Sequence, residues 1–311
     1  MSDKNRDLTI RLLTAGVLLP LIIWLIWLGS LWFALLIGAA AALCSLELNL
    51  LGANATPAAP PPPPGEPAHE GSRKDRRKAR VAERVEEAAA VGALPGAAIV
   101  SVGAAFLLPV LDEIDVSFLS FKLVVTAVVL FAFADTLFFE TDLSRAPQRV
   151  GLAVLGAVYP GLLLSALIRI RQLEHGEWWI ILTLVVTWWN DTGAYFAGRA
   201  FGKRKLFERI SPKKTWEGAI GGLLLATFGA LLVKHFWLPG LPYWGAALIA
   251  LGASFLGPLG DLSESMFKRS FGAKDSGRLL PGHGGMLDRL DALIFTAPFV
   301  LLCARLLLNA G

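Results

Sequence analysis

Charged residues are scarce in this chain, and their scarcity argues against an ordinary soluble protein. Asp, Glu, Lys and Arg make up 17% of the 311 residues, whereas hydrophobic residues make up 55%. A soluble globular domain usually carries about 25% charged residues. We therefore expect lipid, and not only a protein core, to cover much of the apolar surface.

Cysteine and histidine are also scarce, with 2 Cys and 4 His in the whole chain. A disulfide framework or a zinc site needs more of these residues at ligand spacing, so neither is expected. Cys44 and Cys303 each lie inside an apolar stretch, where we expect a core-facing or lipid-facing thiol. A Walker-type Gly-x-x-x-x-Gly-Lys-Ser/Thr sequence is missing as well, which argues against a P-loop nucleotidase.

The basic residues fall between apolar segments. The net charge of +4 could suggest a nucleic-acid partner, but this distribution fits a membrane surface better, so no nucleic acid is expected. About 20 mostly apolar residues span a bilayer as a helix, which also satisfies the backbone hydrogen bonds. The predicted fold class is therefore all-α, a polytopic transmembrane bundle of about nine helices. The nine segments are 8–28, 31–51, 89–111, 117–139, 150–168, 178–198, 217–237, 242–262 and 286–308.

The charges of the connecting loops predict the orientation. Loops after even-numbered segments hold 20 Lys and Arg, and loops after odd-numbered segments hold 3, counting Lys234 near the end of segment 217–237. Positive loops stay in the cytoplasm, so the N-terminus and the even loops are predicted to be cytoplasmic and the C-terminus external. The expected location is the inner, cytoplasmic membrane of the cell, crossed several times.

One stretch interrupts the apolar pattern. Residues 53–70 are rich in Ala and Pro and resemble a stiff spacer, whereas residues 71–88 are dense in charge and could rest on anionic lipid. A solvated insertion without chemistry is the simpler interpretation. The predicted organisation is an N-terminal transmembrane hairpin (1–52), this cytoplasmic insertion (53–88), middle transmembrane helices (89–170) and a catalytic transmembrane region (171–311).

Carboxylates gather at three places that the predicted topology brings to the cytoplasmic boundary. Ionisable residues near a membrane are costly and usually functional. Two carboxylate-bearing helix faces that meet would form an oxygen-rich site suited to Mg²⁺ and a substrate phosphate. The alternative is ion pairing of these acids with Arg269, Arg278 or Arg289. The three places are the end of segment 178–198 (Asn190, Asp191), the end of segment 242–262 (Asp261, Glu264, Ser265) and the start of segment 286–308 (Asp288, Asp291).

Two basic loops that contain glycine flank the acids, at 202–218 and 268–285. Clustered Lys and Arg side chains neutralise a polyphosphate, and glycine lets the backbone approach it closely. Within the second loop, His283 could act as a base, orient a phosphate or cap the following helix, and we favour positioning.

At these residues the chain resembles the phosphatidate cytidylyltransferases (CDP-diacylglycerol synthases). The run Ser265-x-x-Lys268-Arg269, then Lys274-Asp275-x-Gly277, then Pro281-x-His283-Gly284-Gly285-x-x-Asp288-Arg289-x-Asp291 is similar to that family's signature. The stretches 190–195 and 211–218 also look like that family. The resemblance is specific over about 175–295, and the insertion at 53–88 looks like an addition to the usual pattern.

The resemblance implies transfer of the cytidylyl group of CTP to phosphatidic acid, giving CDP-diacylglycerol and pyrophosphate. It implies Mg²⁺, with a monovalent cation such as K⁺ beside it; membrane lipids surround the chain and a homodimer is compatible. The candidate catalytic residues are Asp261, Asp288, Lys268, Arg269 and His283. The candidate substrate-binding residues are Asn190, Asp191, Lys213, Lys214, Ser265, Lys274, Asp275 and Arg289. The candidate metal ligands are Asp261 and Asp288, with Asp291 and Glu264 as further candidates.

Two rival functions stay open at this point. A CTP-dependent polyprenol or phytol kinase would share a membrane-bound CTP site, but it would transfer the γ-phosphate to an alcohol. A cation-coupled transporter would use the acids as an ion pathway, and it predicts acids near mid-bilayer together with an internal repeat. We find no repeat, and the acids cluster at one predicted face.

Overall fold

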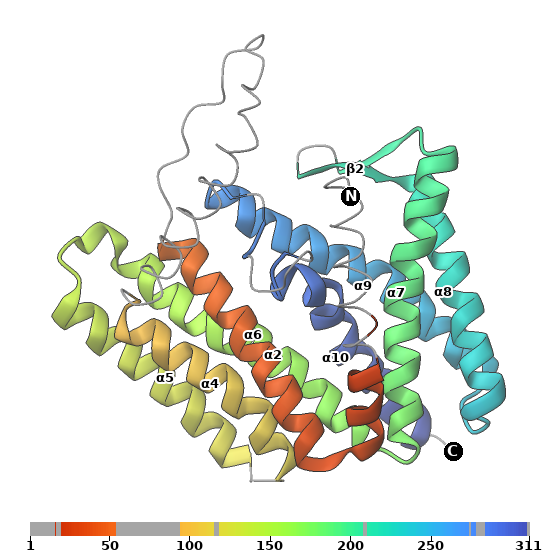
Figure 1. The fold of residues 1–311 in the computed structure, drawn as a ribbon, viewed down its shortest axis with the longest axis horizontal. Coiled ribbons are helices and arrows are strands. Elements are labelled where there is room, and N and C mark those ends of the chain that lie inside the picture. The colour runs from red at the N-terminus through yellow and green to blue at the C-terminus, as the bar shows by residue number, and fades with distance from the viewer. Residues whose placement is uncertain are drawn as a thin grey trace.

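The computed structural model describes residues 16, 20–53, 94–114, 118–207, 210–273, 275–277 and 284–309. Almost all of them are helical (Figure 1). Residues 20–28 form a helix that turns at Gly29, whose φ of +64° suits glycine. The elements that follow are α2 (Ser30–Ala53), α4 (Gly96–Glu113), α5 (Phe118–Phe139), the 3₁₀ turn η1 (Leu143–Arg145), α6 (Ala146–Arg171), α7 (Gly176–Phe201), β1 (Lys205–Phe207), β2 (Ser211–Thr215), α8 (Trp216–Trp237), α9 (Tyr243–Ser270) and α10 (Leu287–Asn309).

The fold class is confirmed as an all-α polytopic membrane bundle. Among the described residues, seven helices are long and apolar enough to cross a membrane: α2, α4, α5, η1 with α6, α8, α9 and α10. Of the two other predicted segments, 8–28 is described only at residues 16 and 20–28. The segment 178–198 forms α7, which is long enough but less apolar because Thr and Trp residues, Asn190 and Asp191 interrupt its aliphatic run.

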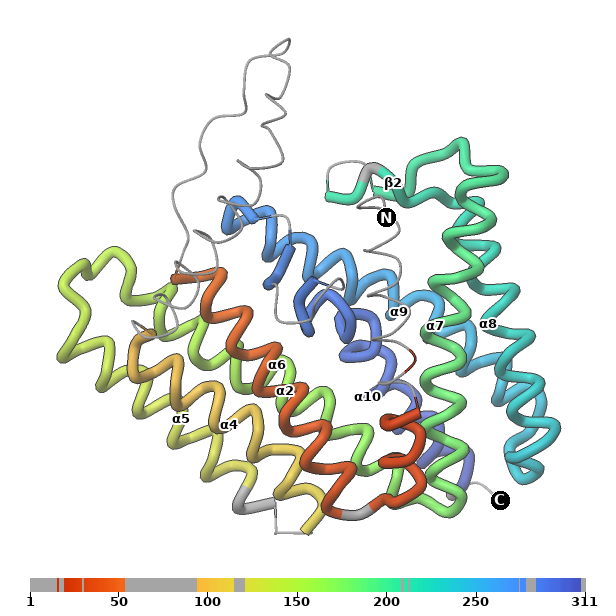
Figure 2. The backbone as a smooth tube through the Cα atoms, viewed as in Figure 1, coloured from red at the N-terminus to blue at the C-terminus, as the bar shows by residue number. Residues whose placement is uncertain are grey.

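The helices pack as two groups that α10 joins. One group consists of α2, α4, α5 and α6, and the other of α7, α8, α9 and α10 (Figure 2). Helix α10 also packs against α6, α7 and α2, so one continuous apolar core runs through most of the bundle. Cys44 and Cys303 are free and buried in this core, as predicted.

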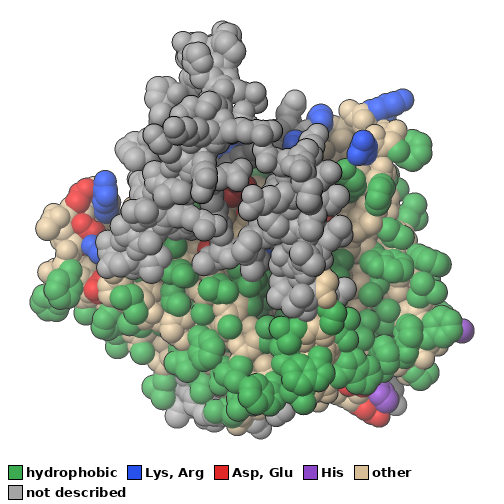
Figure 3. All heavy atoms as spheres, viewed as in Figure 1, with side chains coloured by type: hydrophobic (Ala, Val, Ile, Leu, Met, Phe, Trp, Pro, Cys, Tyr) green, Lys and Arg blue, Asp and Glu red, His purple; other side chains and the backbone are tan. Residues whose placement is uncertain are grey.

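Large apolar side chains cover the outside of the bundle. Phe133, Leu137 and Phe138 of α5 and Leu224 and Phe228 of α8 are all more than half exposed. In the space-filling view, hydrophobic side chains dominate the lower part of the visible face, and Lys and Arg side chains appear above them (Figure 3). Such a contiguous apolar surface is what contact with lipid tails requires. The protein is an integral membrane protein.

Helices α7 and α8 approach each other through glycine. A Cβ on Gly193 would lie 2.5 Å from the carbonyl oxygen of Gly221, and a Cβ on Gly221 would lie 2.2 Å from the Cβ of Ala197. Small residues at such contacts let membrane helices pack backbone to backbone. This close packing fixes the position of Asn190 and Asp191 of α7 relative to α8.

The connection between α7 and α8 is not the plain loop that the sequence predicted. Strands β1 and β2 form a short antiparallel hairpin, an addition to the predicted all-α fold. The Thr215 hydroxyl caps α8 by accepting from Gly218 N at 3.2 Å, and Glu217 accepts from the backbone N–H groups of Lys203 and Arg204. The first bond satisfies a free N–H group at the start of α8, and the bonds to Glu217 tie the chain that follows α7 to the first turn of α8.

Helix α9 also extends beyond its prediction, which ended at residue 262. It runs through Ser270, so Lys268 and Arg269 are helical and not part of a loop. The helix continues because Glu264 and Lys268 pair one turn apart, with 2.5 Å between Oε2 and Nζ. It ends at Gly272 with φ +71°, where the Gly272 and Ala273 N–H groups donate to the carbonyl oxygens of Arg269 and Lys268.

The chain changes direction at the same end of the bundle after α2, α5, α7 and α9. In Figure 1 the hairpin and the connection from α9 to α10 lie toward the upper end, and the C-terminus lies toward the lower end. This arrangement agrees with the predicted alternation of loops. The predicted insertion at 53–88 lies outside the described residues except for Ala53, the last residue of α2.

Candidate active site

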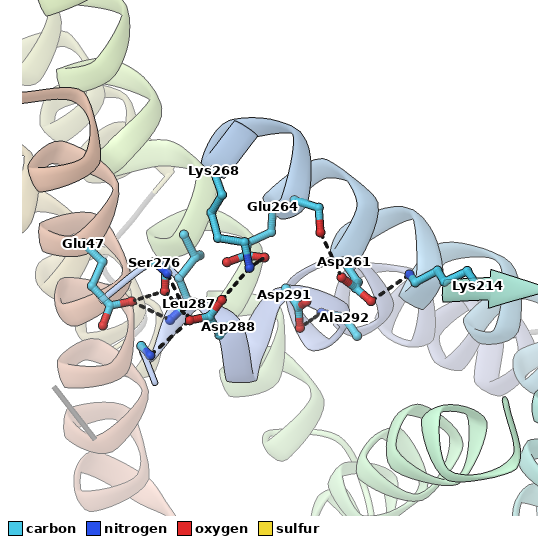
Figure 4. A network of polar contacts seen from close by, with 12 residues as sticks. Glu47, Lys214, Asp261, Glu264, Lys268, Ser276, Leu287, Asp288, Asp291 and Ala292 are labelled. Atoms are coloured by element: carbon cyan, nitrogen blue, oxygen red, sulfur yellow. Dashed lines mark hydrogen bonds and ion pairs between the residues drawn. The ribbon is translucent and has the colours of Figure 1, made fainter. Parts of the chain in front are cut away.

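The centre of the site is the ammonium group of Lys268. Its Nζ lies 2.5 Å from Glu264 Oε2 and 2.6 Å from Asp288 Oδ1, so it links the end of α9 to the start of α10 (Figure 4). The Glu264 side chain is 1% exposed and the Lys268 side chain 13% exposed. Charges this deeply buried are stable only when they are paired, and this pairing therefore fixes the two helix ends against each other.

The second oxygen of Asp288 lies within hydrogen-bond distance of three donors, one of which, the Ser276 hydroxyl, it shares with Glu47. Asp288 Oδ2 receives Ser276 N at 3.1 Å, Ser276 Oγ at 2.9 Å and Gly285 N at 3.1 Å. Its first oxygen is already engaged by Lys268. Both oxygens of this carboxylate are therefore occupied by the protein itself, and the segment before α10 is folded around it.

A group that the sequence analysis missed stands beside this cluster. Glu47 of α2 is 1% exposed and accepts from Met286 N, Leu287 N and Ser276 Oγ at 2.8, 2.8 and 2.9 Å. Figure 4 shows its side chain pointing from α2 toward the start of α10. A signal exists in the sequence, because a lone carboxylate within the apolar run 34–51 is itself a reason to expect function. The prediction did not include Glu47, although this residue lies close to the end of segment 31–51.

A cluster of three carboxylates includes Glu264 and extends one turn toward the N-terminus of α9. Ligand oxygens of Asp261, Glu264 and Asp291 all lie within 4.8 Å of one another. Ser265 Oγ approaches Asp261 Oδ1 at 3.4 Å, which confirms that the two side chains share a helix face as predicted. Asp288, one of the two first-choice metal ligands, is not in this group, and both of its oxygens are engaged by Lys268, Ser276 and Gly285.

The first basic loop, at 202–218, reaches the acids through Lys214. Its Nζ lies 2.7 Å from Asp261 Oδ2 and donates to the Pro258 carbonyl oxygen at 3.2 Å. Strand β2 carries Lys214, so the hairpin delivers a cation to the end of α9. The ion pairs recorded for Asp261, Glu264 and Asp288 are with lysines. Of the arginines named in the alternative interpretation, Arg278 lies outside the described residues.

Helix α7 adds two polar residues to this side of the site. Asp191 is within electrostatic reach of Asp261 and Lys214. Asn190 is 2% exposed, and its Oδ1 has no hydrogen-bond partner among the described residues. A Cβ on Gly222 would come within 2.6 Å of that oxygen, so α8 leaves room for it only through a glycine.

The structure places the other predicted residues less centrally. Lys213, Arg269 and Asp275 are exposed, and Arg289 is an exposed residue in the first turn of α10. Lys274 and His283 lie outside the described residues, so their predicted roles stay predictions. Among the described residues, Glu47 caps α10, which is one of the roles considered for His283.

An apolar cavity of about 400 Å³ opens beside the start of α10. Its walls come from residues 21–26, α2, α6, α7 and α10, and Trp188, Leu290 and Leu293 are among them. Arg289 is the one charged residue among the described residues that line it. A hydrocarbon chain fits such walls, and an anionic group attached to it could meet the guanidinium at the same place.

Three acids and two lysines within one small volume suit phosphate chemistry. Asp261, Glu264 and Asp291 repel one another unless a cation lies among them. Glu264 Oε1 is buried without a hydrogen-bond partner among the described residues, and such an oxygen is a free ligand for a cation. The lysines can neutralise phosphate oxygens.

Comparison with known protein families matches residues 81–307 to the cytidylyltransferase family. The match includes every candidate site residue that the sequence predicted. The chain belongs to the cytidylyltransferase family. Glu47 of α2 lies before the matched residues.

Individual relatives of this family member carry a more specific name. The phosphatidate cytidylyltransferases of Bacillus subtilis and Brucella suis are 45% and 47% identical to it over 154 residues, or 49% of this chain. That of Haemophilus influenzae is 46% identical over 129 residues, or 40% of this chain. The matched segments cover 57%, 56% and 45% of these relatives, so the chain spans about half the length of the curated relatives it matches.

Proposed function

We propose that this protein transfers the cytidylyl group of CTP to phosphatidic acid, releasing CDP-diacylglycerol and pyrophosphate. The observation that carries the proposal is the juxtaposition at one end of a membrane bundle of a phosphate-type site and an apolar cavity. The site supplies Lys268, Lys214 and three clustered carboxylates, and the cavity is lined by Arg289, which follows Asp288 in the first turn of α10. The relatives named above support the same reaction.

In this reaction an oxygen of the lipid phosphate attacks the α-phosphorus of CTP. The bond from that phosphorus to the oxygen that bridges to the β-phosphate breaks, and pyrophosphate leaves with the electron pair. The attacking phosphate is already an anion near neutral pH, so no strong general base is required. Catalysis then depends on holding the two anions in line and on neutralising their charge, which Lys268 and Lys214 are placed to do.

The residues fit the expected Mg²⁺. Asp261, Glu264 and Asp291 form an oxygen-only donor set on two helices, and Glu264 Oε1 is buried without a partner among the described residues. When bound, the ion would supply charge neutralisation for the triphosphate. Asp288 fits a different task, because it orients Lys268 and closes the turn at Ser276 and Gly285. A monovalent cation beside Mg²⁺ stays a prediction.

The decisive assay uses CTP labelled at either the α- or the γ-phosphate. Purified protein, Mg²⁺ and phosphatidic acid should yield a lipid that carries the α-label and not the γ-label. Lipid labelling from γ-labelled CTP would instead indicate a kinase. Absence of any labelled lipid at saturating CTP and phosphatidic acid would refute the proposed reaction.

The apolar cavity should bind an acyl chain of the lipid substrate. Ala40→Leu adds a branched side chain to the cavity wall and should raise the KM for phosphatidic acid about tenfold, because it fills volume that the chain would occupy. The KM for CTP should stay within about twofold. Ala39→Leu is the matched control, since Ala39 is exposed one residue away. Equal lipid KM values for the two variants would contradict this placement.

We also propose that the site faces the cytoplasm, where CTP is available. In Figure 1 the hairpin of β1 and β2, which carries Lys213 and Lys214, lies toward one end of the bundle, and the turn between α8 and α9 lies toward the other. In a background with Cys44 and Cys303 replaced by alanine, Gly240→Cys should react with an impermeant thiol reagent in intact cells. Ser144→Cys, in the exposed η1 turn, should react only after permeabilisation. The reverse pattern would invert the topology. A homodimer stays a prediction that light scattering in detergent would check.

A further inference from the structure

The buried carboxylate of Glu47 has an unusual set of partners. It lies in α2, within a helix that is otherwise apolar enough to cross the membrane, and its exposure is 1%. A carboxylate at such a position is costly unless strong hydrogen bonds compensate for its lost hydration. The bonds recorded for it all come from one segment that lies about 230 to 240 residues away in the sequence: Ser276, Met286 and Leu287.

Two of these partners are the backbone N–H groups at the beginning of α10. Met286 N donates to Oε1 and Leu287 N to Oε2, each at 2.8 Å. The first N–H groups of a helix have no partner inside the helix, and they carry its positive end. The Glu47 carboxylate therefore acts as the anion at the start of α10, supplied by a different helix and not by the residue before α10.

The third partner links Glu47 to the site. The Ser276 hydroxyl lies 2.9 Å from Glu47 Oε2 and 2.9 Å from Asp288 Oδ2, so the two carboxylates face each other across one hydroxyl. Asp288 in turn holds Lys268. A continuous chain of polar contacts thus runs from α2 through Ser276 and Asp288 to Lys268, as Figure 4 shows.

Two glycines give Glu47 the room for this contact. A Cβ on Gly285 would lie 2.0 Å from Ser276 Oγ and 2.5 Å from Glu47 Oε2, and a Cβ on Gly277 would lie 2.8 Å from Glu47 Oε1. Real Cβ atoms do not approach other atoms so closely, so any side chain at either position would displace the carboxylate. The contact of Glu47 with Ser276, Met286 and Leu287 therefore requires glycine at positions 277 and 285.

We propose that Glu47 is a positioning residue of the active site. It anchors the segment 276–287 and the start of α10 to α2, and thereby sets where Asp288 holds Lys268. The transmembrane hairpin that precedes the family match is then part of the catalytic unit. The effect of Glu47 on turnover rests on the proposed function, whereas its anchoring of the start of α10 does not.

The test compares Glu47→Gln and Glu47→Asp with Asn49→Ala in the full-length protein, purified in lipid nanodiscs. Gln keeps the size but points an amide donor at one of the two backbone donors, and Asp is one methylene too short to reach both. Asn49 is the matched control, since it is a buried polar residue of the same helix that contacts Ser101 of α4 and not the 276–287 segment.

Two readouts are measured. In Glu47→Gln, amide hydrogen exchange of the peptide that contains Met286 and Leu287 should accelerate about tenfold or more, because their acceptor is lost. The kcat should fall about 100-fold while the KM for CTP changes by less than about threefold, as expected for a misplaced catalytic group. Glu47→Asp should lie between Glu47→Gln and wild type in both measurements, and Asn49→Ala should leave the exchange of this peptide unchanged.

Wild-type exchange and wild-type kcat in Glu47→Gln would overturn the proposal. An equal acceleration of the same peptide in Asn49→Ala would overturn it too, because the effect would then be a general loosening of α2. If Glu47→Gln is not recovered folded, Glu47→Asp decides by the same two measurements, and wild-type values in it count against the proposal. A wild-type protein that makes no CDP-lipid would refute the proposed reaction, yet the exchange comparison would still test the anchor.

Discussion

Replacing Asp288 by asparagine should lower the kcat of CDP-diacylglycerol formation by about 1,000-fold, at the upper end of what loss of one preorganised polar group costs. The carboxylate holds Lys268 with one oxygen and accepts Ser276 N, Ser276 Oγ and Gly285 N with the other. An amide has one oxygen for these two tasks, and its NH₂ group would face a donor. Lys268 would then keep Glu264 as its one remaining carboxylate partner and shift toward it. Turnover with α-labelled CTP measures the effect.

Asp142→Asn is the matched control for this variant. Asp142 is exposed and caps the η1 turn through Ser144, away from the site, so the same chemical change there should leave turnover within about twofold. Membrane insertion and thermal stability in detergent should be retained in both variants. A purified Asp288→Asn protein with more than about a tenth of wild-type turnover would contradict the role assigned to the Lys268–Asp288 pair.

Replacing Asp261 by asparagine should lower turnover about 100-fold at ordinary Mg²⁺ and should raise the Mg²⁺ concentration for half-maximal activity by about 10- to 100-fold. Asp261 shares a small volume with Glu264 and Asp291, and it also holds Lys214. Asn is a weaker ligand for Mg²⁺ than a carboxylate because it carries no charge. Asp291→Asn should show the same shift without disturbing Lys214.

Magnesium titration separates the two acid groups. High Mg²⁺ should restore part of the turnover of Asp261→Asn and Asp291→Asn, but none of the turnover of Asp288→Asn, whose oxygens are engaged by the protein. An unchanged Mg²⁺ requirement in both Asp261→Asn and Asp291→Asn would remove these residues from the metal site. A shifted requirement in Asp288→Asn would instead support the assignment of Asp288 as a metal ligand, which the sequence suggested.

The amino-acid sequence by itself determined the class of the protein and the location of its chemistry. Twenty-residue apolar runs can satisfy their backbone in lipid only as helices, so the helical membrane fold follows from composition and segment length. Acids and lysines placed at the ends of such runs are too costly to be incidental. For this reason the residue types and their positions along the chain suffice to assign Asp261, Glu264, Lys268, Asp288 and Asp291 to one site.

Only the tertiary structure decided which of these residues pair with one another. Spacing within one helix shows which side chains share a face, but not which charge on another helix faces them. Thus it could not show that Lys268 binds Glu264 and Asp288, or that Lys214 crosses from β2 to Asp261. The end of α9 was also predicted too early, at residue 262. The pairing of Glu264 with Lys268 favours helix beyond the point where the apolar run ends.

Glu47 is the clearest example of a residue whose contacts cannot be predicted from the sequence. The sequence shows a lone acid within an apolar helix, but its partners are backbone N–H groups some 240 positions later, and backbone groups leave no trace in residue identity. The residue composition of a helix is a local property that can be read directly from the sequence. The contacts that hold Asp288, Lys268 and Glu47 together depend on how α2, α9 and α10 pack, and that arrangement exists only in the folded chain.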